Sequence, residues 1–153
     1  MAVIDVSNIN KSFGDTKAVR DVSFEVPSGR IFGLLGPNGA GKTTAIRIIN
    51  HILIADSGSV SINGYPVSPK TQSMIGYMPE ERGLYKKMKV GEQLIYLAQL
   101  KGLSHAEAKQ KTRYWLDRFE ATDWYYKEIG ELSKGMSQKI QFIATIAHDP
   151  DIY

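Results

Sequence analysis

Residues 31–49 read IFGLLGPNGAGKTTAIRII, which is an apolar run, a glycine-rich loop and the start of an amphipathic segment. The loop matches the pattern G-x-x-x-x-G-K-[ST]. The positions that match are Gly36, Gly41, Lys42 and Thr43. A chance glycine-rich turn could carry the same letters, so the flanking segments decide. The run 30–35 has the character of a strand buried on both faces, and 43–53 has helical spacing. A strand before and a helix after are the context of a phosphate-binding loop, which we therefore expect at 36–44.

The residue types of this loop suit the chemistry of a bound phosphate. Glycines let backbone N–H groups turn inward around phosphate oxygens, and the following helix directs its N-terminal N–H groups at the same anion. In this pattern Lys42 reaches the β and γ phosphates, and the hydroxyl of Thr43 is a ligand of Mg²⁺, which takes few protein ligands and keeps several waters.

Strands are expected on both sides of the loop. In 18–26 the residues alternate, with Val22, Phe24 and Val26 on one face and polar residues on the other. Shorter runs of strand character are 2–8, 59–63 and 74–78, and the last three residues, 151–153, read as the start of another strand.

The chain changes character after residue 80. Apolar residues recur at helical spacing through 90–119 and again through 136–147. Ser104 and Glu107 fit a capping box at the start of a second helix within the first of these ranges. The order of strands, glycine loop, helix, strands and a helical block indicates an α/β core with a helical insertion.

Composition limits the classes of function. The 153 residues carry 19 Lys plus Arg and 16 Asp plus Glu, a net charge of +3 that does not argue for nucleic acid. The absence of cysteine excludes disulfides, cysteine-ligated zinc and cysteine catalysis. No apolar run approaches the roughly 20 residues of a membrane span, and no signal peptide is evident. A single soluble cytoplasmic domain is the expectation.

Four segments together resemble the ATP-binding subunits of ABC transporters. GPNGAGKTT is their phosphate loop, and LSKGM at 132–136 stands where the family has its LSGGQ signature before a helix. IGYMPE at 75–80 stands where a strand leads to the Q-loop, and KSF at 11–13 resembles the A-loop, whose aromatic ring stacks on adenine. The strings PEERGLY and LSKGMSQKIQ look most like the sodium- or drug-exporting, NatA-type branch.

The resemblance implies an α/β fold with a P-loop NTPase core, an N-terminal antiparallel β subdomain and a helical insertion subdomain. The implied divisions are 1–80 for the β subdomain and P-loop core, 81–132 for the helical subdomain, and 133–153 for the signature helix and the next strand. Compared with the family, the fold is expected to be incomplete at its C-terminus, before the Walker B segment.

The resemblance also assigns site residues, with ATP and Mg²⁺ as cofactors. Those assigned to nucleotide are Phe13, Val19, Gly36, Pro37, Asn38, Gly39, Ala40, Gly41, Lys42, Thr43, Thr44 and Glu80. Those of the signature, which contacts ATP bound to a partner subunit, are Leu132, Ser133, Lys134, Gly135 and Met136. The residues assigned to the metal are Thr43 and Glu80. Without the resemblance, Phe13 would be read as a core residue and LSKGM as an ordinary helix start.

Several positions depart from the family pattern. Glu80 replaces the usual Gln, and its carboxylate is expected to tighten Mg²⁺ dependence, which Glu80→Gln should relax in a metal titration of ATP binding. Lys134 adds a cation at the dimer interface or points to water. The family's Asp-Glu pair and switch histidine lie beyond residue 153, so little or no ATP hydrolysis is expected from these residues alone.

The implied protein is an ATP-binding subunit that powers solute transport, peripheral on the inner face of the cell membrane. Its implied partners are transmembrane permease subunits and a second ATP-binding subunit in a head-to-tail dimer, with no nucleic acid. Leu84, Tyr85 and Met88 either contact the permease or belong to the insertion's own core. The alternatives are a non-transport ABC ATPase, another P-loop enzyme such as a kinase or GTPase, and a non-catalytic nucleotide-binding fragment.

Overall fold

The computed structural model describes residues 2–80 and 83–153. The chain forms two compact units, which divide between Gln72 and Ser73 and are called unit 1 and unit 2. The divisions expected at residues 80 and 132 stay a prediction.

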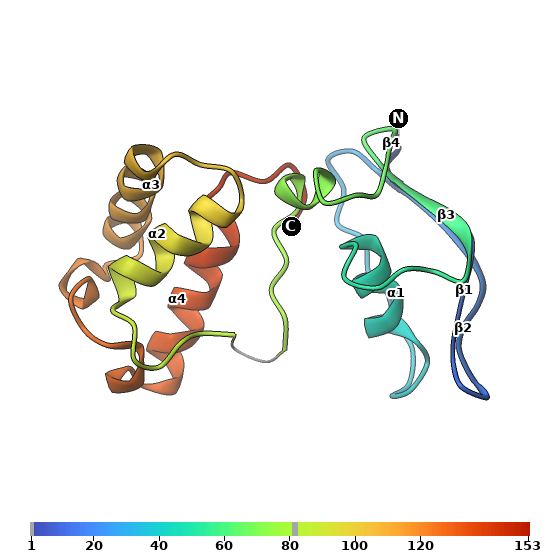
Figure 1. The fold of residues 1–153 in the computed structure, drawn as a ribbon, viewed down its shortest axis with the longest axis horizontal. Helices are drawn as coiled ribbons and strands as arrows, with labels where there is room; N and C mark the ends of the chain where they lie inside the picture. The colour runs from blue at the N-terminus through green and yellow to red at the C-terminus, as the bar shows by residue number, and fades with distance from the viewer. Residues whose placement is uncertain (1, 81–82) are drawn as a thin grey trace. The chain divides into compact units, whose positions relative to one another are not determined.

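Unit 1 is built on a four-stranded antiparallel sheet (Figure 1). The strands are β1 (Ala2–Phe13), β2 (Thr16–Pro27), β3 (Ser57–Ile62) and β4 (Tyr65–Pro66), in the order β2-β1-β3-β4. The predicted antiparallel β subdomain is confirmed. The predicted alternation in 18–26 is also confirmed, because Val22, Phe24 and Val26 are buried or half-buried while the residues between them are exposed.

Helix α1 (Lys42–Ile49) follows the glycine loop and is four residues shorter at its end than the expected 43–53. Asn50 ends it, with its side-chain Nδ2 donating to the carbonyl of Ile46 at 2.9 Å. His51 then takes a positive φ of 53°, and the N–H groups of Ile52 and Leu53 both donate to the carbonyl of Arg47. The helical spacing of apolar residues continues past this point, but the backbone reverses, so periodicity alone overestimates the helix.

The buried strand expected at 30–35 is absent, and this prediction is wrong. Residues 30–37 belong to no strand, and the side chains of Ile31 and Leu35 are almost fully exposed. An apolar run supplies side chains suited to a two-sided interior, but a strand also needs a neighbour to pair its backbone. In the described part of the chain no segment pairs with 30–35.

Unit 2 is dominated by three helices that share one apolar core (Figure 1). They are α2 (Val90–Leu100), α3 (His105–Arg118) and α4 (Lys134–Ile146). Short 3₁₀ turns lie at η1 (Thr71–Met74), which crosses the division between the units, η2 (Thr122–Trp124) and η3 (Ile129–Glu131). The fully buried core side chains include Val90, Leu94, Leu116, Ile140 and Ile143. The helices predicted in 90–119 and 136–147 are confirmed.

Two local predictions in unit 2 have different outcomes. The capping box is present, with Ser104 N–H donating to Glu107 Oε2 at 2.9 Å and Glu107 N–H donating to Ser104 Oγ at 3.3 Å. The strand expected at 74–78 is reduced to one parallel bridge between Ile75 and Ile152, so that strand prediction is wrong in extent. Among residues 2–80 and 83–153, the one bridge to this segment comes from Ile152, and Pro79 has no N–H to extend the pairing.

Across the described ranges, no helix combines the length and apolar character that crossing a bilayer requires.

Candidate nucleotide-binding site

The glycine loop enters α1 through two residues that only glycine adopts readily. Gly39 and Gly41 have φ values of +82° and +88°, in the left-handed region that costs other residues about 1–2 kcal/mol. Between them, Ala40 N–H donates to the carbonyl of Pro37 at 3.2 Å. The loop thus turns back on itself just before the helix begins at Lys42.

Gly41 also lies against strand β2 with no room for a side chain. A Cβ at this position would stand 2.1 Å from the carbonyl oxygen of Ala18 and 3.5 Å from Cγ2 of Val19. The structure therefore brings Val19, which is buried, into contact with the loop. Its predicted place beside the adenine base stays a prediction.

The N-terminus of α1 is open. Its N-cap residue, Gly41, has no side chain to accept from the first N–H groups, which have no partner within the helix. In contrast, Ser104 and Ser133 cap α3 and α4 with their hydroxyl groups. An uncapped helix start behind a glycine turn offers N–H donors and a positive dipole end, which fit a phosphate group.

Lys42 folds back over the loop in this structure. Its Nζ donates to the carbonyls of Gly36 and Pro37, both at 2.7 Å. The two bonds fold Gly36 and Pro37 back toward the helix start, and they place the ammonium group at the mouth of the turn. The hydroxyl of the adjacent Thr43 belongs to an exposed residue, which leaves it accessible to a metal ion.

Phe13 lies at the end of β1 with half of its surface exposed, so its reading as a core residue is wrong. The Nζ of Lys11 stands 5.7 Å from the centre of its ring. Asp56 holds this end of the strand, with one carboxylate oxygen accepting from Lys11 Nζ and the other from Ser12 N–H, each at 2.7 Å. These two bonds hold the pKa of Asp56 below its usual range. The Phe13 ring is accessible for stacking.

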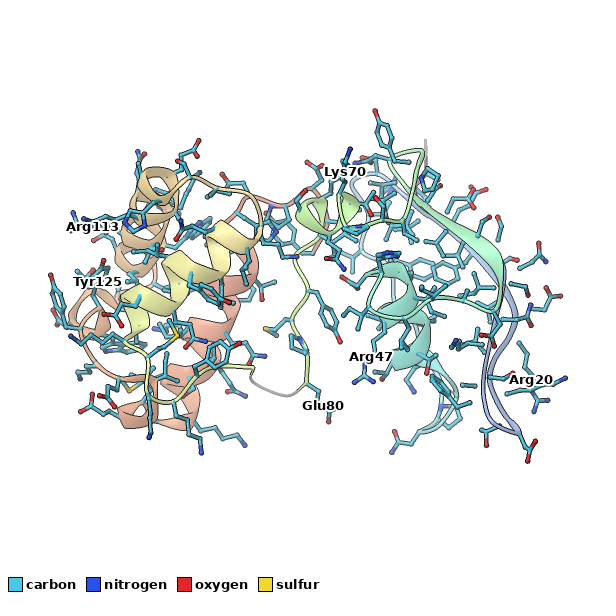
Figure 2. The ribbon with its side chains drawn as sticks, viewed as in Figure 1. Arg20, Arg47, Lys70, Glu80, Arg113 and Tyr125 are labelled. Carbon is cyan, nitrogen blue, oxygen red and sulfur yellow. The ribbon has the colours of Figure 1, made fainter. Side chains whose placement is uncertain are left out.

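Glu80 and the signature residues belong to unit 2. Glu80 is exposed at the end of an extended segment, from which its side chain projects (Figure 2). Ser133 is the N-cap of α4, with its Oγ accepting from Met136 N–H at 3.2 Å. Gly135 is exposed, with nothing within 4 Å of where a Cβ would stand, and Lys134 is exposed as well. LSKGM thus begins a helix, and its contact with nucleotide stays a prediction.

The residues considered for a permease contact differ in their burial, and that contact stays a prediction. Leu84 packs against the core of unit 2, as one alternative expected. Tyr85 is exposed, and with Met88, Lys87 and Tyr96 it lines a surface cavity of about 310 Å³.

A second cavity, of about 370 Å³, lies elsewhere on unit 2 and is lined in part by Arg113 and Tyr125, which Figure 2 labels. The Arg113 guanidinium lies 6.0 Å from the centre of the Tyr125 ring. Neither cavity includes a residue of the glycine loop.

The donor set at the loop suits Mg²⁺ carried by a nucleotide. Within residues 2–80 and 83–153, no cluster of three or more His, Cys, Asp or Glu could hold a metal. Mg²⁺ at a phosphate loop needs no such cluster, because it takes substrate phosphates, waters and one or two protein oxygens. One accessible hydroxyl beside an uncapped helix start meets that requirement.

The fold and the loop together are those of a P-loop nucleotide-binding protein. The model of the ABC transporter family matches residues 19–153, and the chain belongs to that family. It is 49% identical over 150 residues to an ABC transporter ATP-binding protein of Bacillus subtilis, YhaQ, covering 98% of this chain and 50% of that protein. It is 35% identical to the ABC transporter ATP-binding protein NatA of the same organism, covering 98% of this chain and 64% of NatA.

A solved structure, that of an ATP-binding subunit of an ABC transporter, superposes with a TM-score of 0.85 at 30% identity. The match covers 97% of this chain and 63% of the solved one. The predicted α/β ABC ATPase fold and the resemblance to NatA are confirmed. The chain spans about half the length of the curated relatives it matches.

Two features of the site were missed by sequence reasoning. The contact of Gly41 with the Ala18 carbonyl joins residues 23 positions apart, and the motif gives no sign of it. The side chain of Gln141 donates to the carbonyl of Pro79 at 2.8 Å, next to Glu80. A polar residue on the buried side of the α4 pattern was the available signal, because a buried amide requires a partner.

Proposed function

We propose that this chain binds ATP with Mg²⁺ as the nucleotide-binding part of a subunit that powers transport across a membrane. The observation that carries the proposal is the glycine loop, which turns through two left-handed glycines into an uncapped helix with Lys42 at its mouth. Membership of the ABC transporter family, whose ATP-binding proteins are in general ATPases, supports ATP as the ligand.

Within this proposal, the loop residues act on the phosphates. The backbone N–H groups at the start of α1 donate to the anion, and the ammonium group of Lys42 exchanges its two carbonyl acceptors for phosphate oxygens. The hydroxyl of Thr43 and the carboxylate of Glu80 hold Mg²⁺, which neutralises phosphate charge when it is bound. The Phe13 ring stacks on the base beside Val19.

We further propose that a second copy of the subunit supplies Ser133 and Gly135 to this nucleotide in a head-to-tail dimer. Permease subunits are the expected membrane partners, which places the protein in the cytoplasm at the inner face of the membrane. The 153 residues alone are expected to bind ATP and to hydrolyse little or none, because the groups that orient the attacking water are not among them.

The test is calorimetry of ATP–Mg²⁺ binding to the 153-residue chain and to two variants. Lys42→Ala removes the proposed phosphate contact, and Lys109→Ala removes an exposed lysine of α3 as a matched control. We expect Lys42→Ala to weaken binding at least about tenfold, since a hydrogen bond to a charged group contributes roughly 1.5–3 kcal/mol. A folded chain that binds no ATP, or binds it equally well in both variants, would contradict the proposal.

A further inference from the structure

The extended segment that ends at Glu80 is attached at its start to the ends of two helices of unit 2. The carbonyl oxygen of Ile75 lies 3.3 Å from Nε2 of His148 and 3.3 Å from Nζ of Lys101. His148 follows α4, and Lys101 follows α2. Ile75 itself is buried, so its carbonyl is satisfied by these side chains within the unit.

The next residue, Gly76, lies directly on α4. A Cβ at this position would stand 2.7 Å from the carbonyl oxygen of Thr145 and 3.0 Å from the ring of Pro150. The N–H of Gly76 donates to the carbonyl of Ile152 at 2.7 Å. The backbone is therefore fixed against the C-terminal end of α4 before it continues toward Glu80.

The other end of this segment is hydrogen-bonded to a side chain of α4. Gln141, on the buried face of α4, donates from Nε2 to the carbonyl of Pro79 at 2.8 Å. Pro79 is bonded directly to Glu80, so this hydrogen bond limits the movement of the backbone that carries the Glu80 carboxylate. Residues 76–80 lie outside the helices and strands, so no regular pattern of backbone hydrogen bonds holds them.

The helix that holds Pro79 is also the helix that begins at the signature. Ser133 is the N-cap of α4, and Gln141 follows it by eight residues, which is about 12 Å along the axis. The hydrogen bond from Gln141 therefore connects the Glu80 segment to the helix that carries Ser133 and Gly135 at its start.

We propose that Gln141 is a positioning residue that joins the Glu80 segment to the signature helix, so that both respond to nucleotide together. The inference rests on the proposed function of this chain as an ATP-binding subunit. In this role Gln141 touches neither nucleotide nor metal. It acts through the Pro79 carbonyl, and the loss of its donor should release Glu80 without unfolding the helix.

The test uses spin labels, because the chain has no cysteine of its own. Met78→Cys places a nitroxide on the segment at an exposed position, and Glu92→Cys places one on the exposed face of α2 as a reference. Gln141→Met then removes the donor while keeping the side chain's length and apolar burial. Gln138→Met, at an exposed position of the same helix, is the matched control.

In the nucleotide-free chain, we expect Gln141→Met to narrow the spectrum at position 78 and leave position 92 unchanged, while Gln138→Met changes neither. In calorimetry with unlabelled chains, we expect Mg²⁺ to raise the affinity for ATP, and we call this increase the Mg²⁺ gain. Gln141→Met should reduce the Mg²⁺ gain about fivefold, the factor associated with one neutral hydrogen bond. In a Glu80→Ala background the same substitution should have no effect on the Mg²⁺ gain, because no side-chain oxygen remains at position 80 to be positioned.

Two results would overturn the inference alone while Lys42-dependent ATP binding persists. The first is equal label mobility at position 78 in Gln141→Met and Gln138→Met. The second is an unchanged Mg²⁺ gain in Gln141→Met despite a mobile label, which would leave Gln141 a local tether with no role in the site. Loss of Lys42-dependent ATP binding in the folded parent chain would instead refute the proposed function, and the inference with it.

Discussion

Gly41→Ala is the substitution that most directly tests how the phosphate loop is held. Gly41 has a φ of +88°, and an added Cβ would stand 2.1 Å from the carbonyl oxygen of Ala18. Gly39 provides a matched comparison, since its φ is +82° but nothing lies within 4 Å of an added Cβ. The two substitutions share the backbone strain and differ in the collision with β2.

The structure gives the expected size of each effect. The left-handed backbone costs alanine about 1–2 kcal/mol, which is the whole penalty expected at Gly39. At Gly41 the Cβ must move roughly 1 Å to reach the closest tolerated approach, and overpacking of this kind adds about 1–3 kcal/mol. We expect Gly41→Ala to lower the free energy of unfolding of unit 1 by about 3 kcal/mol, against about 1 kcal/mol for Gly39→Ala.

Unfolding in urea can be followed by two signals that report the units differently, because both tryptophans, Trp115 and Trp124, lie in unit 2. Far-ultraviolet circular dichroism includes the sheet of unit 1, whereas tryptophan fluorescence reports unit 2. Gly41→Ala should shift the first signal to lower urea and leave the second in place. Equal shifts of circular dichroism for the Gly41 and Gly39 variants would show that the loop does not need to approach β2, and the reasoning would fail.

Two further predictions concern unit 2. Ile140→Ala should lower the free energy of unfolding of unit 2 by about 2–5 kcal/mol, because Ile140 is fully buried in the helical core. The measurement is tryptophan fluorescence in urea, and the control, Gln138→Ala at an exposed position, should change that free energy by no more than about 0.5 kcal/mol. Burial, and secondarily the charge of Lys101, lowers the pKa of His148 below its ordinary value, so the unfolded chain binds the proton more readily. Stability should therefore fall as pH drops from about 7 through 6.5, and His148→Gln should flatten that dependence in urea titrations at each pH; an unaltered slope would contradict it.

Local chemistry could be predicted from the sequence where it determines the structure by itself. Ser104 and Glu107 form both bonds of the capping box, because each partner lies within one helical turn of the other. The apolar stripe through Ile140 and Ile143 also gave the correct face of α4, since burial in a helical core follows the period of the helix. Helix α1 was overestimated because the backbone reverses at His51, which has a φ of 53°, before the apolar pattern ends.

The motif of the candidate site could be predicted from the sequence, but the tertiary contacts that hold the site in place could not. The pattern gives the identity of Gly41 and Lys42, because the turn and the charge are needed at those positions. It does not give the β2 carbonyl that Gly41 approaches, or the amide of Gln141 on Pro79, because those contacts join segments that no local rule relates. Such contacts depend on how the chain packs, and a single sequence does not encode them in its spacing.

Because residues 30–35 do not form the expected strand, the glycine loop is held by other contacts. Exposure of Ile31 and Leu35 leaves unburied two side chains that would each contribute roughly 1.5–3 kcal/mol in a core. This segment instead contacts the sheet through a ring pair, since Phe32 stacks on Phe24 of β2 with 5.1 Å between the ring centres. The C-terminal end of the glycine loop is held by Gly41 against β2 and by the start of α1.

The N-terminal end of the loop is held instead by Lys42, through its two bonds to the carbonyls of Gly36 and Pro37. The ammonium group thus has two tasks: in this structure it bonds the two carbonyls that close the turn, and in the proposed function it contacts the phosphates. Lys42→Ala should consequently loosen the free loop as well as weaken ATP binding. A replacement that restores only the charge, Lys42→Arg, should recover part of the binding, because the bulkier planar guanidinium does not reproduce the compact ammonium between two carbonyls.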